Sequence, residues 1–383
     1  MAQVFLTQTT AFTLQLGASL AFAILVSIIL DLGAQLNIWK VITVSNMRGQ
    51  DIANAIVPGL GYIVTILVVM GGLAFNIGNV AGAGLGLQAF TDGISGGSFI
   101  ISTELGAVIS AIIAIGIFLF KEAGRAMDKF VQYAGIVMIL LTCYVVVNSS
   151  PPLAEAAYRT VMPEKFDKEI ILATITLVGG TVGGYITFAG AHRLIDSGVH
   201  GPEMLKDVSR GALAGIGVTA IMRIILFLAV LGIVSQGYEI AMSNPVASVF
   251  QNAAGKVGYM FFGIIMWAAA ITSVIGAAYT SVSFLRIFSP KVAQHLNKII
   301  IAFIVISTIV FISVGRPVDI LILVGALNGL ILPLTLGPIL VAAYNKKIVG
   351  DYKHPIWQAV FGALVVIIMA ILGGSTLYTY LMS

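Results

Sequence analysis

Apolar runs of about 20 residues recur along the whole chain, separated by short polar breaks. A helix needs about 20 apolar residues to cross the hydrocarbon core of a bilayer, whereas barrel strands are about half as long and alternate in polarity. Hydrophobic residues make up 59% of the 383 residues and charged residues 9%, which leaves too little polar surface to cover a soluble body. The sequence therefore predicts an all-α, polytopic helical bundle in a cell (plasma) membrane, which in a bacterium is the cytoplasmic membrane.

The alternation of apolar runs and polar breaks predicts ten spans. They lie near residues 17–42, 58–90, 103–120, 130–149, 170–191, 211–235, 257–285, 299–314, 318–343 and 355–381. Fourteen of the 20 Lys and Arg residues fall in breaks on one side, which the positive-inside rule makes cytoplasmic. These are Lys40, Arg48, Lys121, Arg125, Lys129, Arg193, Lys206, Arg210, Arg286, Lys291, Lys298, Lys346, Lys347 and Lys353.

This orientation makes the span that begins at Gly17 run inward from the outer surface. Residues 1–16 are too short for a complete span, so they should form only part of a first helix. We therefore expect that the chain starts late or that its start codon is misassigned.

The composition argues against several classes of function. The formal net charge of +4 reflects basic residues retained on one face of the membrane, so no nucleic-acid partner is expected. Cys143 is the single cysteine, which excludes an intrachain disulfide and a cysteine metal cluster. His192, His200, His295 and His354 fall at cytoplasmic ends or loops without metal-ligand spacing. The sequence contains no G-x-S-x-G, P-loop or H-E-x-x-H motif, so we expect neither an enzyme nor a cofactor.

A glycine-rich stretch interrupts the apolar run from Ile170 to Ala191 near mid-depth, with the sequence Leu-Val-Gly-Gly-Thr-Val-Gly-Gly-Tyr over residues 177–185. A helix in hydrocarbon must satisfy its own backbone, so such a stretch is tolerated only where it packs on protein or lines a polar cavity. One interpretation is a broken helix of the kind that holds substrates in secondary transporters. The other is close packing of a neighbouring helix on the small-xxx-small pairs of glycines.

Few ionisable or amide side chains lie deep in the spans. Asp31 lies near the middle of one span, with Gln35 one turn later, and Arg223 lies near the middle of another. Asp31 and Arg223 either form a structural salt bridge, or one of them faces a transport route. Asn76 and Asn79 share one helical face, where they either bond neighbouring helices or offer their amides to a ligand.

Two further segments allow alternative structures. Asn328 precedes Pro333 and Pro338, which predict either a second broken helix or a simple kink. The segment 235–257 forms either a short amphipathic helix on the outer surface or an ordinary loop.

Four motifs carry a family resemblance that covers nearly the whole chain from Gly17 onward. They are the span start at residues 17–22, the turn Arg-Gly-Gln-Asp-Ile-Ala-Asn-Ala at residues 48–55, the break Gly180-Thr181-Val182 and the proline pair Pro333 and Pro338. Their order resembles the NRAMP family of divalent-metal transporters, in particular a divergent bacterial branch. The resemblance implies a LeuT-like inverted repeat of five plus five helices plus one, with broken first and sixth helices around a central site.

The resemblance also has departures. The family's first-helix D-P-G-N should fall near Leu6 to Thr9, where aspartate and proline are absent, and the M-P-H of the sixth helix is replaced by Gly183-Gly184-Tyr185. The D-x-x-E pair of the third helix looks like Asn76 and Asn79, and the tenth-helix glutamine is Ile331. Without these ligands, a larger cavity for a hydrated ion such as magnesium, or for a small organic solute, fits the glycine substitutions better.

The resemblance implies one transporter domain over residues 1–383. It would comprise a partial, truncated first helix (1–16), the remainder of the first repeat (17–149), the second repeat (170–343) and an extra C-terminal helix (355–381). The leading hypothesis is transport of a divalent cation by alternating access. The alternatives are a small carboxylate or amino-acid-like solute on the same fold, and a non-transporting scaffold. Expected partners are membrane lipid and the small transported ion or solute, and the candidate binding residues are Thr7, Gln8, Thr9, Asn76, Asn79, Gly180, Thr181, Gly183, Gly184, Tyr185 and Asn328.

Overall fold

The computed structural model describes residues 2–315 and 317–382, and all regular elements in this part are helical. The first half contains α1 (Ala2–Leu16), α2 (Leu20–Ser45), α3 (Gly49–Ile56), α4 (Leu60–Ser95), α5 (Thr103–Leu119), α6 (Lys121–Ser149) and α7 (Leu153–Arg159). The second contains α8 (Lys168–Gly179), α9 (Ile186–Asp196), α10 (Leu205–Ser235), α11 (Pro245–Phe284), α12 (Pro290–Gln294), α13 (Leu296–Val314), α14 (Pro317–Ala342), α15 (Lys346–Val349) and α16 (Ile356–Met382). Short 3-10 turns lie at Gly17–Ser19, Pro202–Met204 and Leu285–Ile287.

The helices agree with the ten predicted spans. Eight helical segments in the described residues are long and apolar enough to cross a membrane. The 17-residue α5 and the α8–α9 pair account for the other two predicted spans. Residues 2–16, expected to be part of a first helix, form α1, which the positive φ of Gly17 separates from α2.

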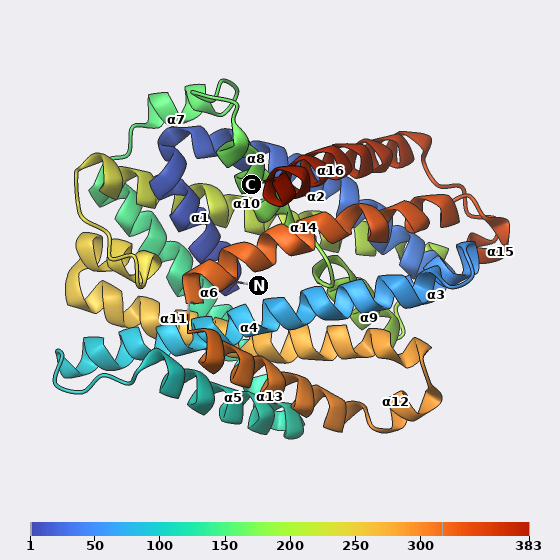
Figure 1. The fold of residues 1–383 in the computed structure, drawn as a ribbon, viewed down its shortest axis with the longest axis horizontal. Coiled ribbons are helices and arrows are strands. Elements are labelled where there is room, and N and C mark those ends of the chain that lie inside the picture. The colour runs from blue at the N-terminus through green and yellow to red at the C-terminus, as the bar shows by residue number, and fades with distance from the viewer. Residues whose placement is uncertain (1, 316, 383) are drawn as a thin grey trace.

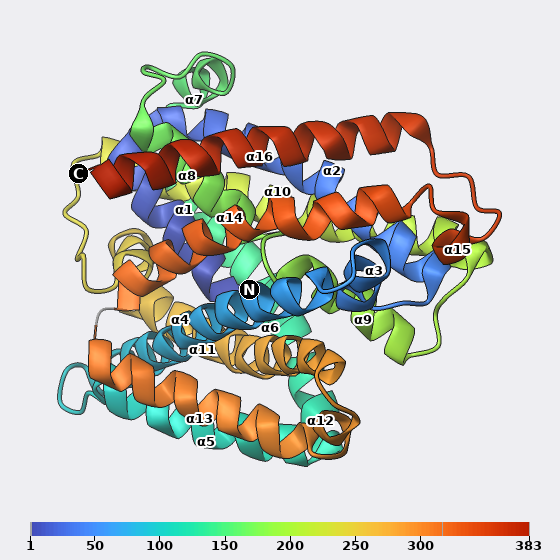
Figure 2. The same cartoon turned by 45° about the vertical axis from the view of Figure 1, so that its right-hand side comes forward.

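The long helices run side by side along the longest axis of the molecule (Figure 1). The short helices α3, α12 and α15 gather at one end of the bundle, whereas α7 lies at the opposite end, as both views show (Figures 1 and 2). Arg48, Lys291 and Lys346 belong to the first end, so the fold brings together basic segments that the sequence assigned to one membrane face.

Close packing of glycine faces holds the long helices together. Helix α4 packs along α11, where a Cβ atom built on Gly86 would lie 2.6 Å from the backbone nitrogen of Trp267. A Cβ atom on Gly263 would lie equally close, 2.6 Å from the backbone nitrogen of Phe90. The two backbones therefore approach as closely as small-residue interfaces permit in membranes.

Two segments differ from what the sequence suggested. The proline-containing helix α14 runs from Pro317 to Ala342 as one helix, so a second broken helix is wrong there. The segment before Val257 does form a short helix, which ends at Gly255 (φ 61°, ψ −159°), but Val246 and Phe250 are buried in the core and do not lie on the outer surface. Their apolar side chains belong to a buried cluster with residues of α6 and α10.

Candidate functional site

The predicted break is present between α8 and α9. Helix α8 ends at Gly179 and α9 begins at Ile186. Between them the N–H groups of Thr181, Val182 and Gly183 all donate to the carbonyl of Val178, at 3.1, 2.9 and 3.2 Å, so the regular helical ladder is lost. Gly184 has a φ of +53°, a conformation that glycine adopts without strain.

The same glycines also serve close packing, so the break and the packing on a neighbouring helix occur in one segment. A Cβ atom on Gly179 would lie 1.8 Å from the carbonyl oxygen of Gly325 in α14. One on Gly183 would lie 2.6 Å from the carbonyl oxygen of Asn328. The broken segment is therefore seated on the backbone of α14.

The candidate residues of α1 are buried. The Nε2 group of Gln8 donates to the carbonyl of Leu321 in α14 at 2.9 Å. Its amide fits between two glycines, because a Cβ on Gly180 would lie 2.4 Å from Oε1 and one on Gly325 would lie 2.1 Å from Nε2. Thr7 is 2% exposed, and the Thr9 hydroxyl donates to the carbonyl of Phe5 in its own helix. Gln8 thus joins α1, the break and α14.

A second polar cluster lies between the break and helices α4, α13 and α14. Asn328 donates from Nδ2 to the carbonyl of Gly71 in α4 at 3.1 Å, and its Oδ1 lies against Gly184, where a Cβ atom would be 1.7 Å away. The Asn76 amide donates to the Ser307 hydroxyl of α13 at 3.1 Å, so Asn76 makes the interhelical bond that was one of its two predicted roles.

Tyr185 joins this cluster from the break. Its ring packs edge-to-face on Phe75, with centroids 5.4 Å apart, and its hydroxyl lies near the Asn79 amide, neither of whose polar atoms has a hydrogen-bond partner among the described residues. Within the described residues, the Oδ1 atoms of Asn76 and Asn328 are buried without a hydrogen-bond partner. The cluster therefore retains acceptor capacity in a tightly packed environment.

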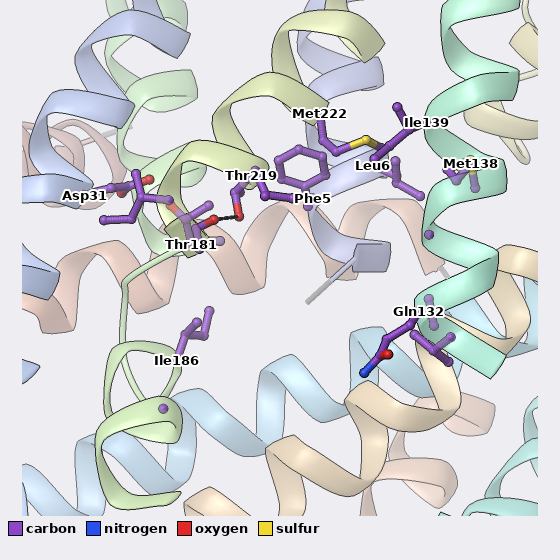
Figure 3. Close-up of a pocket in the computed structure, with 18 of the residues that line it drawn as sticks. Phe5, Leu6, Asp31, Gln132, Met138, Ile139, Thr181, Ile186, Thr219 and Met222 are labelled. Atoms are coloured by element: carbon purple, nitrogen blue, oxygen red, sulfur yellow. Dashed lines mark hydrogen bonds between the residues drawn. The ribbon is translucent and has the colours of Figure 1, made fainter. Parts of the chain in front are cut away.

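The cavity beside the break has a volume of about 660 Å³. Its walls come from α1, α2, α6, α9, α10 and α11, and most of the lining side chains are apolar. Figure 3 shows Asp31, Thr181 and Thr219 together on one side and Gln132 of α6 across from them.

Two of the candidate residues, Gly180 and Thr181, line this cavity. The remaining nine are not among its lining residues; they are Thr7, Gln8, Thr9, Asn76, Asn79, Gly183, Gly184, Tyr185 and Asn328. The side chains from α6 and α11 could not be found from sequence, because an apolar residue that faces a cavity and one that faces lipid give the same signal.

Asp31 and Arg223 do not pair directly, and Asp31 faces the cavity. Asp31 lines the cavity, and it is 4% exposed. Arg223 attracts it electrostatically, but no carboxylate–guanidinium contact within 4 Å joins these two described side chains, so a direct salt bridge is wrong. The guanidinium instead donates to the Ser27 hydroxyl (3.1 Å) and the Leu177 carbonyl (3.4 Å), and it lies 4.6 Å from the ring centroid of Phe5.

A polar cluster at the end of α9, which we call the α9 latch, was not predicted from the sequence, although its residues Arg48 and Gly49 begin the motif at residues 48–55. Asp196 forms an ion pair with Arg48 at the start of α3 and accepts a hydrogen bond from Tyr279 of α11 at 2.8 Å. The Gly49 N–H donates to Nε2 of His192 at 3.1 Å. The latch ties the half-helix α9 to α3 and α11.

In the described residues, His, Cys, Asp and Glu nowhere form a group of three or more that could hold a metal ion.

A helical bundle with one span broken and a cavity beside the break is an arrangement that several folds of membrane transporters share. The chain belongs to the Nramp family: the family model described as natural resistance-associated macrophage protein-like matches residues 9–379. It is 60% identical over 377 residues to the uncharacterized membrane protein YcsG of Bacillus subtilis, which covers 98% of this chain and 91% of that protein.

Two solved structures show the same fold. The Eremococcus coleocola manganese transporter, in complex with an aromatic bis-isothiourea substituted compound, matches with a TM-score of 0.72 at 17% identity, covering 97% of this chain and 82% of that one. MhsT in complex with L-phenylalanine matches with a TM-score of 0.65 at 14% identity, covering 97% of each chain. The predicted fold class, a LeuT-like multi-pass membrane protein, is therefore confirmed.

Proposed function

We propose that this chain is a secondary transporter that moves a divalent metal cation by alternating access around the α8–α9 break. Membership of the Nramp family supports transport rather than catalysis. The observation that carries the proposal is the cavity of about 660 Å³, which lies against Gly180 and Thr181 of the break. Broken helices in secondary transporters place free backbone groups at the cargo site, and this cavity is where such groups would meet cargo.

The manganese transporter of Eremococcus coleocola shares the fold and gives a divalent ion as the first cargo to test. In this chain the family's anionic and thioether ligands are substituted, so carbonyl, hydroxyl and amide oxygens would contact the cargo. The eleven predicted binding residues divide accordingly: Gly180 and Thr181 would touch it in the conformation described. The residues of α1, α4 and α14, together with Gly183, Gly184 and Tyr185 of the break, would hold the break in shape and could reach the cargo only after a rearrangement.

Alternating access is largely the rocking or gating of one part of the bundle against another around a fixed site, and in this proposal one half of the broken helix belongs to the moving part. Helix α9 fits such a moving part, because the polar contacts of the α9 latch hold its last turn, whereas Gly183 and Gly184 lie just before its first turn. Opening of the latch would expose the cavity at the basic end of the bundle.

Uptake of Mn²⁺ and Mg²⁺ into proteoliposomes tests the proposal. We expect uptake above that of empty vesicles, and we expect Thr181→Val to lower it about tenfold, the size of one hydrogen bond to a charged group. Thr308→Val is the matched control, because Thr181 and Thr308 each donate to the carbonyl four residues earlier, at 2.9 and 2.8 Å, but Thr308 lies in α13 away from the cavity. The absence of ion flux above empty vesicles would reject a metal cargo.

The apolar walls of the cavity favour one second candidate, a small carboxylate or amino-acid-like solute. Small-molecule sites typically enclose about 300–1,000 Å³ with mainly apolar walls, and this cavity lies within that range. Labelled amino acids and cyclic amides should then compete in the same vesicles, with no flux of Mn²⁺ or Mg²⁺. A scaffold without transport would show neither flux.

A further inference from the structure

Asp31 is the one described carboxyl side chain that is buried, at 4% exposed, and it lies inside a membrane-spanning helix. A charged side chain at the centre of a helix span costs roughly 2.5–3.5 kcal/mol on the insertion scale, so such a residue usually has a partner or a functional role. Its Oδ1 atom has no hydrogen-bond partner among the described residues. The carboxylate also lines the cavity, where it is the single charged side chain.

The polar side chains around Asp31 face the cavity as acceptors. The Thr181 hydroxyl donates to the Leu177 carbonyl at 2.9 Å, and the Thr219 hydroxyl donates to the Gly215 carbonyl at 2.9 Å. The Thr181 hydroxyl also interacts with the Asp31 carboxyl, so its proton is engaged within the protein, as is that of Thr219, while each hydroxyl oxygen can still accept. Gln35 uses its Nε2 group toward the Ala212 carbonyl at 3.5 Å, which leaves Oε1 as an acceptor. Figure 3 shows Asp31, Thr181 and Thr219 as neighbours on one wall.

Arg223 limits how strongly this wall can bind a bare ion. Its guanidinium is held by Ser27, Leu177 and Phe5, so its positive charge stays close to Asp31 whatever occupies the cavity. One carboxylate, already partly compensated by a fixed cation, cannot replace the several oxygen ligands that a dehydrated divalent ion requires. A cation that keeps its water shell does not need these ligands, because its bound waters already coordinate it. The same waters present only O–H donors to the wall of the cavity.

We propose that Asp31, Gln35, Thr181 and Thr219 form an outer-sphere site that binds a divalent cation with its water shell intact. This inference rests on the proposed transport function and names the form of its cargo. The site and the hydrated ion are complementary in hydrogen bonding, because the four side chains offer acceptors and the water shell offers donors on all sides. Six waters at about 30 Å³ each give roughly 180 Å³, which the cavity of about 660 Å³ admits.

Cobalt(III) hexaammine tests this site directly, because it resembles a hexahydrated divalent ion, presents N–H donors and does not exchange its ligands. We expect it to inhibit Mg²⁺ and Mn²⁺ uptake into proteoliposomes to the same extent. Asp31→Asn should lower both uptakes about tenfold, because it removes a charge-assisted acceptor. Asp319→Asn is the matched control: it makes the same change of charge at an exposed residue in the first turn of α14 and should leave uptake within about twofold.

Ligand binding is measured separately from transport, as the shift of the thermal unfolding temperature in detergent. Cobalt(III) hexaammine and Mg²⁺ should each raise it in the native protein and in Asp319→Asn, but not in Asp31→Asn. If Asp31→Asn does not fold, Asp31→Glu, which retains the carboxylate, should keep the shift with cobalt(III) hexaammine.

The two proposals fail in different ways. A thermal shift that depends on Asp31, together with no flux, would overturn transport of these ions and support the hydrated-ion site. Ion uptake that cobalt(III) hexaammine does not inhibit would overturn the hydrated-ion site and leave transport standing. The absence of any shift with cobalt(III) hexaammine, or an equal shift in Asp31→Asn, would likewise overturn the site.

Discussion

Gly184 allows the backbone conformation that the break requires. Its φ of +53° is unfavourable for a residue with a side chain, and a Cβ atom there would lie 1.7 Å from Oδ1 of Asn328. Asn328 cannot easily move away, because its Nδ2 group is bonded to carbonyls of both α4 and α14. A single methyl group at Gly184 would therefore press on two helices as well as on the break.

We expect Gly184→Ala to abolish uptake and to lower the free energy of unfolding by about 1–3 kcal/mol, from the strained backbone and the overpacked contact. Gly276→Ala is the matched control, because Gly276 lies inside α11 with nothing within 4 Å of its Cβ position. It should leave uptake unchanged and should be neutral or slightly stabilising. Flux assays and thermal unfolding in detergent measure both effects, and full uptake by Gly184→Ala would contradict a role for the break in transport.

The single residues show where sequence reasoning reaches its limit. Four glycines within one span indicate a break or close packing, because the small size and backbone freedom of glycine are local properties. The partner of each glycine is not local: Gly179 and Gly183 meet α14, and nothing in their own segment specifies that helix. The same holds for Asp31, for which spacing alone could not distinguish the salt bridge from the cavity-facing position that it adopts.

At the scale of elements, the α9 latch controls how far the end of the half-helix can move. The Arg48 and Asp196 side chains are 12% and 28% exposed, so their ion pair is shielded from water more than an ordinary surface pair. Loss of this pair and of the Tyr279 hydrogen bond should shift α9 toward a conformation with the cavity open to the cytoplasmic side.

Asp196→Asn should therefore expose the cavity more often. In a Cys143→Ala background, Ile186→Cys places a thiol on the cavity wall, and a membrane-impermeant maleimide should label it roughly fivefold faster when Asp196→Asn is added, because about 1 kcal/mol changes a population by that factor. Asp207→Asn is the control, since the Asp207–Arg210 pair is 4.0 Å long and largely exposed. Equal labelling rates in all three proteins would show that the α9 latch does not restrain α9.

Elements of this chain were predictable to different degrees. The ten spans follow from apolar length alone, and each coincides with a helix or with the α8–α9 pair. The continuous course of α14 through Pro333 and Pro338 was not predictable, because neighbouring helices decide whether a proline kinks or breaks a span. The burial of the helix that begins at Pro245 also depends on distant partners, which its own amphipathic pattern does not identify.

At the scale of the whole molecule, α16 lies outside the two predicted repeats, 17–149 and 170–343, and that division of the chain stays a prediction. Helix α16 packs on α14 and α2, so it joins the second half of the chain to the first. The loop before it adds a buried polar contact, in which Nε2 of His354 lies 2.7 Å from Oδ1 of Asn37 in α2. Since an amide oxygen only accepts, Nε2 must donate, and the Tyr352 hydroxyl can donate to Nδ1 at 3.3 Å.

This arrangement makes the attachment of α16 sensitive to acid. Burial, and secondarily the Lys40 ammonium, lowers the pKa of His354 to about 4, against about 6.5 for a free histidine. The unfolded chain therefore binds a proton at higher pH than the folded chain, so this contribution to stability is complete above about pH 6.5 and is lost progressively as the pH falls toward 4. We expect the thermal unfolding temperature in detergent to fall between pH 7.5 and 5.0, and to fall less in His354→Gln, whose amide can still donate to Asn37. His295→Gln, at an exposed histidine, should keep the full pH dependence of the native protein. An unchanged pH dependence in His354→Gln would mean that the junction of α16 with α2 does not titrate in this range.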